Sequence, residues 1–219
     1  MHDDHHDHPH DHDAHAPIEH PHEMGIHEKC IRAIQALLIE KGIVTGDELR
    51  RQEEIMDAIS AALGAKVVAR AWVDAGFKDR LLADAKSAIT ELDLTPDPMT
   101  TLVAVENREN LHNVVVCTLC SCYPRTLLGL PPAWYKSLEY RSRVVSEPRE
   151  VLREFGLELD PEVEVRVYDS TADIRYVVIP ERPAGTEDMT EAELAELVTR
   201  DSMIGVSKGC YKIKLSQPT

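Results

Sequence analysis

The sequence lacks several features that would assign it to common classes of protein. No apolar run approaches the roughly 18 residues that cross a bilayer, so we expect no membrane partner. Positive charge is scarce, with 24 Lys and Arg against 39 Asp and Glu and a formal net charge of -15. This balance excludes nucleic acid as a partner, because binding it needs a cationic surface. The first residues show no basic and apolar signal pattern, so we expect a cytoplasmic location.

Histidine is almost absent after residue 27, where His112 is the only one. Residues 1–27 hold the other ten histidines, together with seven acidic residues and no Lys or Arg. Such a stretch cannot bury a core, so we predict a disordered tail. Two roles stay open for it, a solvated tail or a metal-loading segment. Any catalytic pair of a serine or cysteine with a histidine in the rest of the chain would have to use His112.

Helical patterns dominate residues 28–98. Residues 28–42 place apolar side chains on one helical face, and Gly42 predicts the end of that helix. Thr45 and Glu48 form a capping-box pattern for a second helix, and further helices are expected near residue 65 and from Asp74 to Ile89. We therefore predict a helical N-terminal arm over 28–98, which could wrap around another subunit.

The texture changes after Pro96 and Pro98. Strands are predicted over residues 102–105, 114–116, 162–168 and 173–179, and helices over 147–155 and after Thr190. The predicted fold class is α+β, with the helical arm followed by a layered α/β domain over 99–219 that carries a metal-binding loop.

Three of the five cysteines lie within six residues, as Cys117-Thr118-Leu119-Cys120-Ser121-Cys122. So tight a cluster indicates metal binding or redox chemistry rather than dispersed disulfides. A structural zinc site would want a fourth ligand, but Cys30 and Cys210 each stand alone. A redox disulfide would need only Cys117 and Cys120, which leaves Cys122 unexplained.

A third solution uses the backbone between these side chains. Cys120, Ser121 and Cys122 are consecutive, so the amide nitrogens of Ser121 and Cys122 lie between their side chains. If both amides lose their protons, two nitrogens and three sulfurs make five ligands and leave a sixth position open. Co(III) or Fe(III) could bear that much anionic donation, whereas zinc gains nothing from it. Spacing alone leaves zinc, redox chemistry and this claw open.

Several stretches together resemble a known family. VVVCTLCSCYP (Val114–Pro124), LLGLPPAWYKS (Leu127–Ser137) and VTRDSMIGV (Val198–Val206) look like the α subunit of nitrile hydratase, as do GAKVVARAWVD (Gly64–Asp74) and YRSRVVSEPREVLREFGLEL (Tyr140–Leu159). The likeness runs from about residue 28 to 206, and Thr118 resembles the cobalt-type motif. It implies a non-corrin Co(III) centre, one per subunit, that hydrates a small nitrile to an amide. It also implies a β subunit, in a heterodimer or α2β2 heterotetramer, and a cobalt-insertion activator protein.

The resemblance also implies roles for individual residues. Thiolate ligands would come from Cys117, Cys120 and Cys122, and amide ligands from Ser121 and Cys122. Cys120 would be oxidised to sulfinic acid and Cys122 to sulfenic acid. The oxidised cysteines need cationic neighbours, expected largely from the β subunit, with in-chain candidates at Arg141, Arg143 and Arg175. The nucleophile is either water or the sulfenate oxygen of Cys122.

Further pocket residues follow from the same likeness. Asp173 stands where the family often has Glu, in an active-site proton network, and Tyr123 and Trp134 could line the pocket or pack in the core. Arg125 departs from the Trp of many relatives and resembles the γ subunit of thiocyanate hydrolase, whose substrate is an anion. That enzyme, which forms carbonyl sulfide and ammonia, is the alternative function. A non-catalytic zinc- or metal-binding protein is the alternative of another class.

Overall fold

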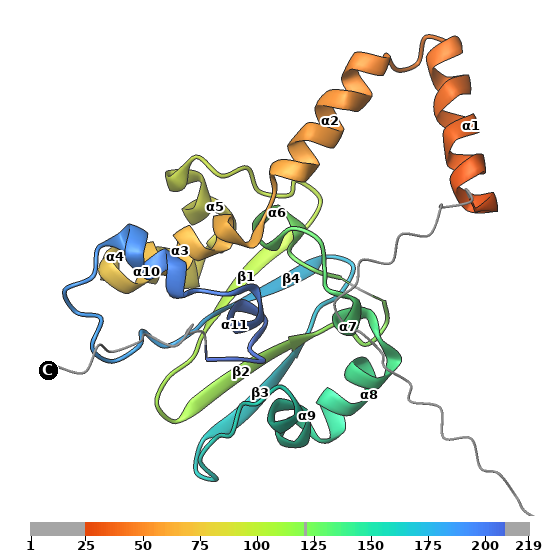
Figure 1. The fold of residues 1–219 in the computed structure, drawn as a ribbon. Coiled ribbons are helices and arrows are strands. Elements are labelled where there is room, and N and C mark those ends of the chain that lie inside the picture. Colours follow the sequence, from red (N-terminus) through yellow and green to blue (C-terminus); the bar gives the residue numbers. More distant parts are fainter. Residues whose placement is uncertain (1–24, 121, 209–219) are drawn as a thin grey trace, which may run out of the picture. The chain divides into compact units, whose positions relative to one another are not determined.

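The computed structural model describes residues 25–120 and 122–208 (Figure 1). Contacts between residues divide the chain into two compact units at Arg51 and Gln52, and each unit is described by itself. The predictions for the His-rich tail up to residue 24, for Ser121 and for Cys210 lie outside the described residues.

The first unit contains the helix α1 (Ile26–Glu40) and the start of α2 (Gly46–Ala58). The predicted capping box is confirmed, because the Glu48 carboxylate accepts from the Thr45 amide at 2.7 Å and the Thr45 hydroxyl accepts from the Glu48 amide at 3.1 Å. Along α1 the apolar side chains of Ile31, Ile34 and Leu37 remain exposed. This amphipathic helix therefore has an apolar face that its own unit does not bury.

The second unit begins with helices that pack into its core. The helix α3 (Ala61–Val73) buries Val67 and Val68, and α4 (Ala75–Ala83), α5 (Ala85–Ala88) and the 3-10 helix η1 (Ile89–Leu92) follow it. The predicted helix over 74–89 is broken at Asp84, whose carboxylate caps α5 by accepting from the Ser87 amide. The part of the predicted arm from α3 onward contributes to the core of the second unit, and the predicted domain boundary at residue 98 stays a prediction.

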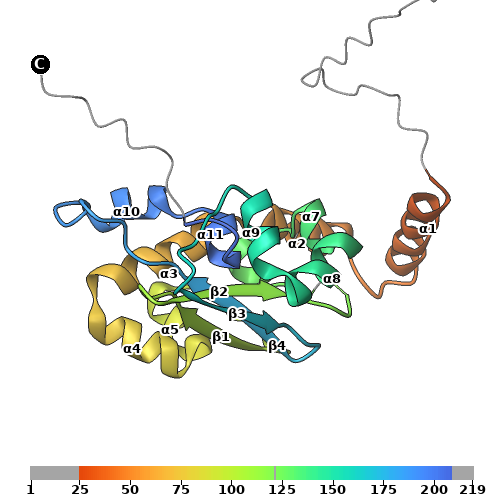
Figure 2. The ribbon, with the colours of Figure 1, turned by 90° about the horizontal axis from the view of Figure 1, so that it is seen from below.

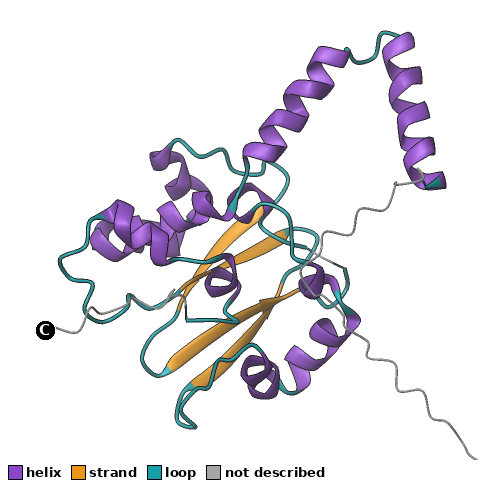
Figure 3. Cartoon of the chain, in the orientation of Figure 1, coloured by secondary structure: helices purple, strands orange, loops and turns teal. Residues whose placement is uncertain are grey.

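Four strands form two parallel pairs (Figure 3). The strand β1 (Thr101–Glu106) pairs with β4 (Ile174–Ile179), and β2 (Leu111–Val116) pairs with β3 (Glu164–Asp169). Short turns join β1 to β2 and β3 to β4, so chain direction reverses within each connection. The carboxyl ends of β2 and β3 therefore share one edge with the amino ends of β1 and β4.

Helices complete this unit after β2. They are α6 (Arg125–Leu128), α7 (Ala133–Lys136), α8 (Leu138–Ser146), α9 (Pro148–Glu154), α10 (Glu191–Leu197) and α11 (Arg200–Ile204). Figure 2 shows α9 and α11 on the same side of the strands, where α9 packs on β3 and α11 on β2 and β4. The α+β class is confirmed. Across the described ranges, no helix is long and apolar enough to cross a membrane.

Candidate metal centre

The cysteine loop leaves the sheet edge where β2 ends. Val116 is fully buried, and its carbonyl accepts from the Ser170 amide at 2.7 Å, which continues the pairing of β2 with β3 by one residue. Cys117 is fully buried directly after the strand, Cys122 is half-buried and Cys120 is exposed. The loop thus rises from the core toward solvent within six residues.

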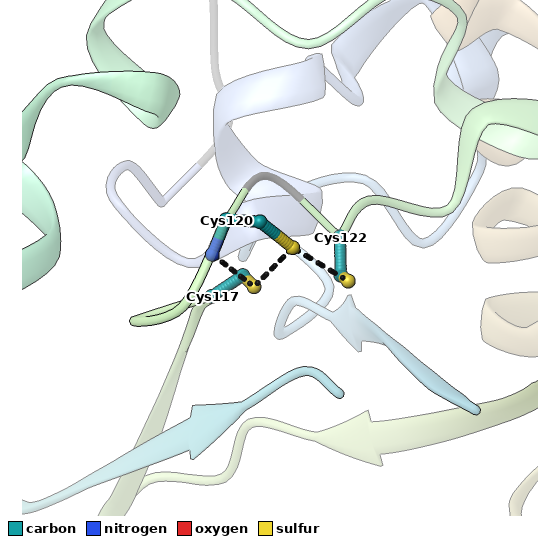
Figure 4. A group of neighbouring side chains, drawn as sticks. All are labelled: Cys117, Cys120 and Cys122. Atoms are coloured by element: carbon teal, nitrogen blue, oxygen red, sulfur yellow. Dashed lines mark hydrogen bonds between the residues drawn. The ribbon is translucent and has the colours of Figure 1, made fainter. Parts of the chain in front are cut away.

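The three thiols converge (Figure 4). Cys120 Sγ lies 3.5 Å from Cys117 Sγ and 3.2 Å from Cys122 Sγ, and all three sulfurs lie within 4.8 Å of one another. For metal–sulfur bonds of about 2.3 Å, sulfurs at right angles lie about 3.3 Å apart and tetrahedral ones about 3.8 Å. The 3.2 Å separation fits adjacent positions of an octahedral ion, and the 3.5 Å separation lies about midway between the two geometries.

Hydrogen bonds hold the loop from both sides. The Asp169 carboxylate, at the end of β3, accepts from the Thr118 amide at 2.9 Å and from its hydroxyl at 2.6 Å. Arg141 of α8 donates to the carbonyls of Cys117 and Thr118, at 3.1 and 2.6 Å. The Tyr135 hydroxyl donates to the Cys122 carbonyl at 2.9 Å. The backbone that carries the thiols is therefore preorganised by groups outside the loop.

The raised pKa of the Cys122 thiol keeps this group protonated when no cation is bound. Burial is the main cause that raises the pKa of Cys122 to about 12, and hydrogen bonds with Cys120 and Cys117 act in the same direction. The positive charge of Arg175 opposes this rise. A bound cation would stabilise the thiolate forms, so metal binding at this cluster should release protons.

His112 cannot serve as a catalytic partner of these thiols. It is buried near the start of β2, where the Gly205 carbonyl lies 2.7 Å from its Nε2 and the Asn107 side-chain nitrogen lies 3.2 Å from its Nδ1. Both ring nitrogens are thus engaged. Burial lowers the pKa of His112, which keeps the ring neutral.

Of the three arginines predicted as cationic support, one touches the loop. Arg141 binds two of its carbonyls, and Arg175 acts on Cys122 by charge alone while it donates to backbone carbonyls of its own turn. Arg143 is bonded to Glu147 and Glu154 instead, and its role as support of the site stays a prediction.

The remaining predicted residues fall in three places. Tyr123, Arg125 and Arg175 line a cavity of about 90 Å³ together with Lys86 and Asp97. Trp134 packs edge-on against Tyr140 and Phe155, in an aromatic cluster, and its role in a pocket stays a prediction. Asp173 is exposed in the turn before β4, where its carbonyl accepts from the Thr101 amide, and its catalytic role also stays a prediction.

Sequence reasoning missed Asp169 and Tyr135. The signal for Asp169 was available in principle, since it ends a strand pattern that could pair with the one before Cys117. Tyr135 gave no separate signal, because only the placement of α7 beside the loop brings its hydroxyl to the Cys122 carbonyl, 13 residues away along the chain.

The chain is similar over most of its length to proteins of one known family. The family model described as nitrile hydratase, alpha chain, matches residues 26–207. The chain belongs to the nitrile hydratase α-chain family. It is 52% identical over 178 residues to the low-molecular-weight cobalt-containing nitrile hydratase α subunit of Rhodococcus rhodochrous, a match that covers 81% of this chain and 86% of that one.

The chain is also similar to a thiocyanate hydrolase subunit and to an Fe-type nitrile hydratase. The thiocyanate hydrolase γ subunit of Thiobacillus thioparus is 42% identical over 186 residues, which cover 80% of this chain and 76% of that one. Among solved structures, a double mutant of the Fe-type nitrile hydratase from Comamonas testosteroni Ni1 matches with a TM-score of 0.78 and 43% identity, over 84% of this chain and 90% of that one. The fold and the cysteine cluster are thus those of this family.

Proposed function

We propose that this chain is the α subunit of a cobalt nitrile hydratase, which converts a nitrile to the amide. The observation that carries the proposal is the converging cluster of Cys117, Cys120 and Cys122 in a chain 52% identical to a cobalt-containing relative. When bound, cobalt would supply the Lewis acidity that makes a nitrile carbon electrophilic or a water more acidic.

Three thiolates and the backbone nitrogens of Ser121 and Cys122 would hold the ion. Two features of the described residues fit this donor set: the short sulfur separations and the absence of histidine from the cluster. Five such ligands would leave one coordination position for substrate or water.

The burial of the cysteines supports the proposed oxidation pattern. Oxidation of a thiolate follows its accessibility. Cys120 is exposed, Cys122 is half-buried and Cys117 is fully buried. This gradient fits a sulfinic acid on Cys120, a sulfenic acid on Cys122 and an unmodified thiolate at Cys117. A sulfenate oxygen on Cys122 or a water held beside it would act as the nucleophile.

A β subunit completes the proposed enzyme, as a heterodimer or an α2β2 heterotetramer. Large apolar side chains are exposed in the loop, at Leu119, and on α8, at Leu138 and Val145, and a partner surface would cover them. We also propose a cobalt-insertion activator protein and a cytoplasmic location, since the thiols must be reduced when the metal enters.

The test is expression with the β subunit and activator in cobalt-containing medium. We expect one cobalt per α chain by elemental analysis and conversion of acrylonitrile to acrylamide. A cobalt-loaded complex that forms no amide from acrylonitrile or benzonitrile would contradict the proposal. Zinc in place of cobalt, without a sulfur-to-cobalt absorption band, would support the metal-binding protein instead.

A second candidate is thiocyanate hydrolysis to carbonyl sulfide and ammonia. The observation that favours it is the cavity beside the loop, where Arg125 and Arg175 present positive charge to a small anion. The same complex should then release carbonyl sulfide from thiocyanate, and absence of that gas excludes this candidate.

A further inference from the structure

The helix α8 presents a guanidinium group to the loop. Arg141 donates from Nε to the Cys117 carbonyl at 3.1 Å and from a terminal nitrogen to the Thr118 carbonyl at 2.6 Å. The planar fork of arginine has a fixed donor spacing, so it dictates the relative orientation of the two carbonyls it binds. One side chain therefore contacts the peptide groups after both Cys117 and Thr118.

The position of Arg141 is itself fixed. The preceding residue, Tyr140, is buried, and its hydroxyl donates to the Val115 carbonyl on β2 at 2.7 Å. Ser137 caps α8 by accepting from the Tyr140 amide at 3.1 Å. The helix α8 is thus bonded to β2, the strand that leads into the loop, and the backbone that carries Arg141 is fixed relative to that strand.

Thr118 is held on its other side by Asp169, through its amide and its hydroxyl. All of its hydrogen-bonding groups are therefore engaged by residues outside the loop. The same segment places Cys117 Sγ where it accepts from the Cys120 amide at 3.3 Å. Without the hydrogen bonds from Arg141, the Cys117 and Thr118 carbonyls would lose their donor, and the backbone of the loop could change its conformation.

The charge of Arg141 is available to the loop. Within residues 25–120 and 122–208, no carboxylate forms a salt bridge with it. Arg143 lies two residues further along α8. In contrast to Arg141, its guanidinium forms ion pairs with both Glu147 and Glu154. A site of three thiolates and two deprotonated amides would carry excess negative charge, which a cation at hydrogen-bonding distance from the loop would offset.

We propose that Arg141 is a positioning residue that holds the loop of Cys117 to Cys122 in its ligating shape before the metal enters and balances its charge afterwards. This inference rests on the proposed function for the identity of the metal, but not for the shape of the loop. It assigns to α8 a direct part in building the site.

The first test compares Arg141→Gln with Arg143→Gln in the complex with the β subunit. Groups that orient metal ligands typically contribute about 10- to 100-fold to metal affinity. We expect Arg141→Gln to lose cobalt to a chelator at least about tenfold faster and to shift the sulfur-to-cobalt absorption band. Arg143→Gln should match the unaltered complex in both. Arg141→Lys, which keeps charge but not the fork, should recover part of the retention.

The second test needs no cobalt and so separates this inference from the proposed function. Complexes made in cobalt-depleted medium with a chelator are treated with iodoacetamide, and alkylation of Cys117 is followed by peptide mass. We expect Arg141→Gln to expose the buried Cys117 thiol and raise its alkylation rate about tenfold, because two hydrogen bonds from a charged donor to the loop are lost. Equal protection of Cys117 in Arg141→Gln and Arg143→Gln would overturn the proposal, whatever metal the complex binds.

Discussion

The two ends of β2 show how one strand can serve both the fold and the chemistry. At its start, Asn107, His112 and Asn113 form a buried network in which Asn107 Oδ1 accepts from the backbone amide of Asn113 at 2.8 Å. At its end, Cys117 leads into three thiols that converge on one another, and the Cys117 sulfur also accepts from the Cys120 amide at 3.3 Å. The His112 ring and the Asn107 side chain are thus hydrogen-bonded within the fold, whereas the three sulfurs are brought within reach of a single ion.

The largest expected effect is at the cysteine end. Cys120→Ala removes an exposed thiol, so the metal-free complex should unfold at an unchanged temperature. Cobalt content should fall to background and amide formation by at least about a thousandfold, since a metal contributes several kcal/mol to such a transition state. Elemental analysis and an acrylonitrile assay measure both. Retention of cobalt in this variant would show that Cys120 is not a metal ligand and would contradict the assigned role of this end of β2.

Substitutions near the start of β2 should lower the stability of the fold. Gly205 has φ +91°, and a Cβ there would lie 2.0 Å from the Asn113 carbonyl oxygen on β2. We expect Gly205→Ala to lower the free energy of unfolding by about 4 kcal/mol or to prevent folding. Urea unfolding followed by circular dichroism measures it, with Gly185→Ala as a control that has φ +78° but no atom within 4 Å of the added Cβ. Equal effects of the two changes would refute the close packing on β2.

His112 gives this end a pH dependence. Its pKa is lowered in the folded chain because of burial, so the unfolded chain binds more protons near pH 6. The stabilisation is full above the unfolded pKa of about 6.5 and is lost as pH falls through the lower folded value. The difference in unfolding free energy between the unaltered chain and His112→Gln should therefore shrink from pH 8 to pH 5. A difference that grows as pH falls would contradict the neutral ring.

The smallest effect concerns the cavity beside the loop. Arg125 is exposed, so its charge should contribute about 1 kcal/mol or less to the binding of an anion. Arg125→Ala should weaken inhibition of nitrile hydration by thiocyanate roughly fivefold and leave cobalt content unchanged. Steady-state inhibition constants measure the first and elemental analysis the second. Unchanged inhibition would show that the anion binds elsewhere.

The sequence allowed prediction of those parts that depend on neighbours along the chain. The caps at Thr45 and Thr190, the strand pattern over 162–168 and the converging cysteines are local, and the structure contains all of them. The helix α8 was not predicted, because its amphipathic pattern is short and its role depends on Tyr140 reaching β2.

The support of the site escaped prediction for the same physical reason. Asp169 and Arg141 lie 51 and 23 residues from Thr118, and only strand pairing and helix docking bring them to it. The sequence does not separate Arg141 from Arg143, because both stand on one short helix and differ only in their neighbours in space. Distances in space, rather than residue type, separate the arginine that binds the loop from the one that binds Glu154.

The central claim is that Cys117, Cys120 and Cys122 form an oxidised cobalt claw. Its most direct test is metal analysis of the purified complex together with the mass of the peptide that spans Cys117 to Cys122. The account predicts one cobalt per α chain, two added oxygens on Cys120, one on Cys122 and none on Cys117. Zinc with three unmodified cysteines would contradict it.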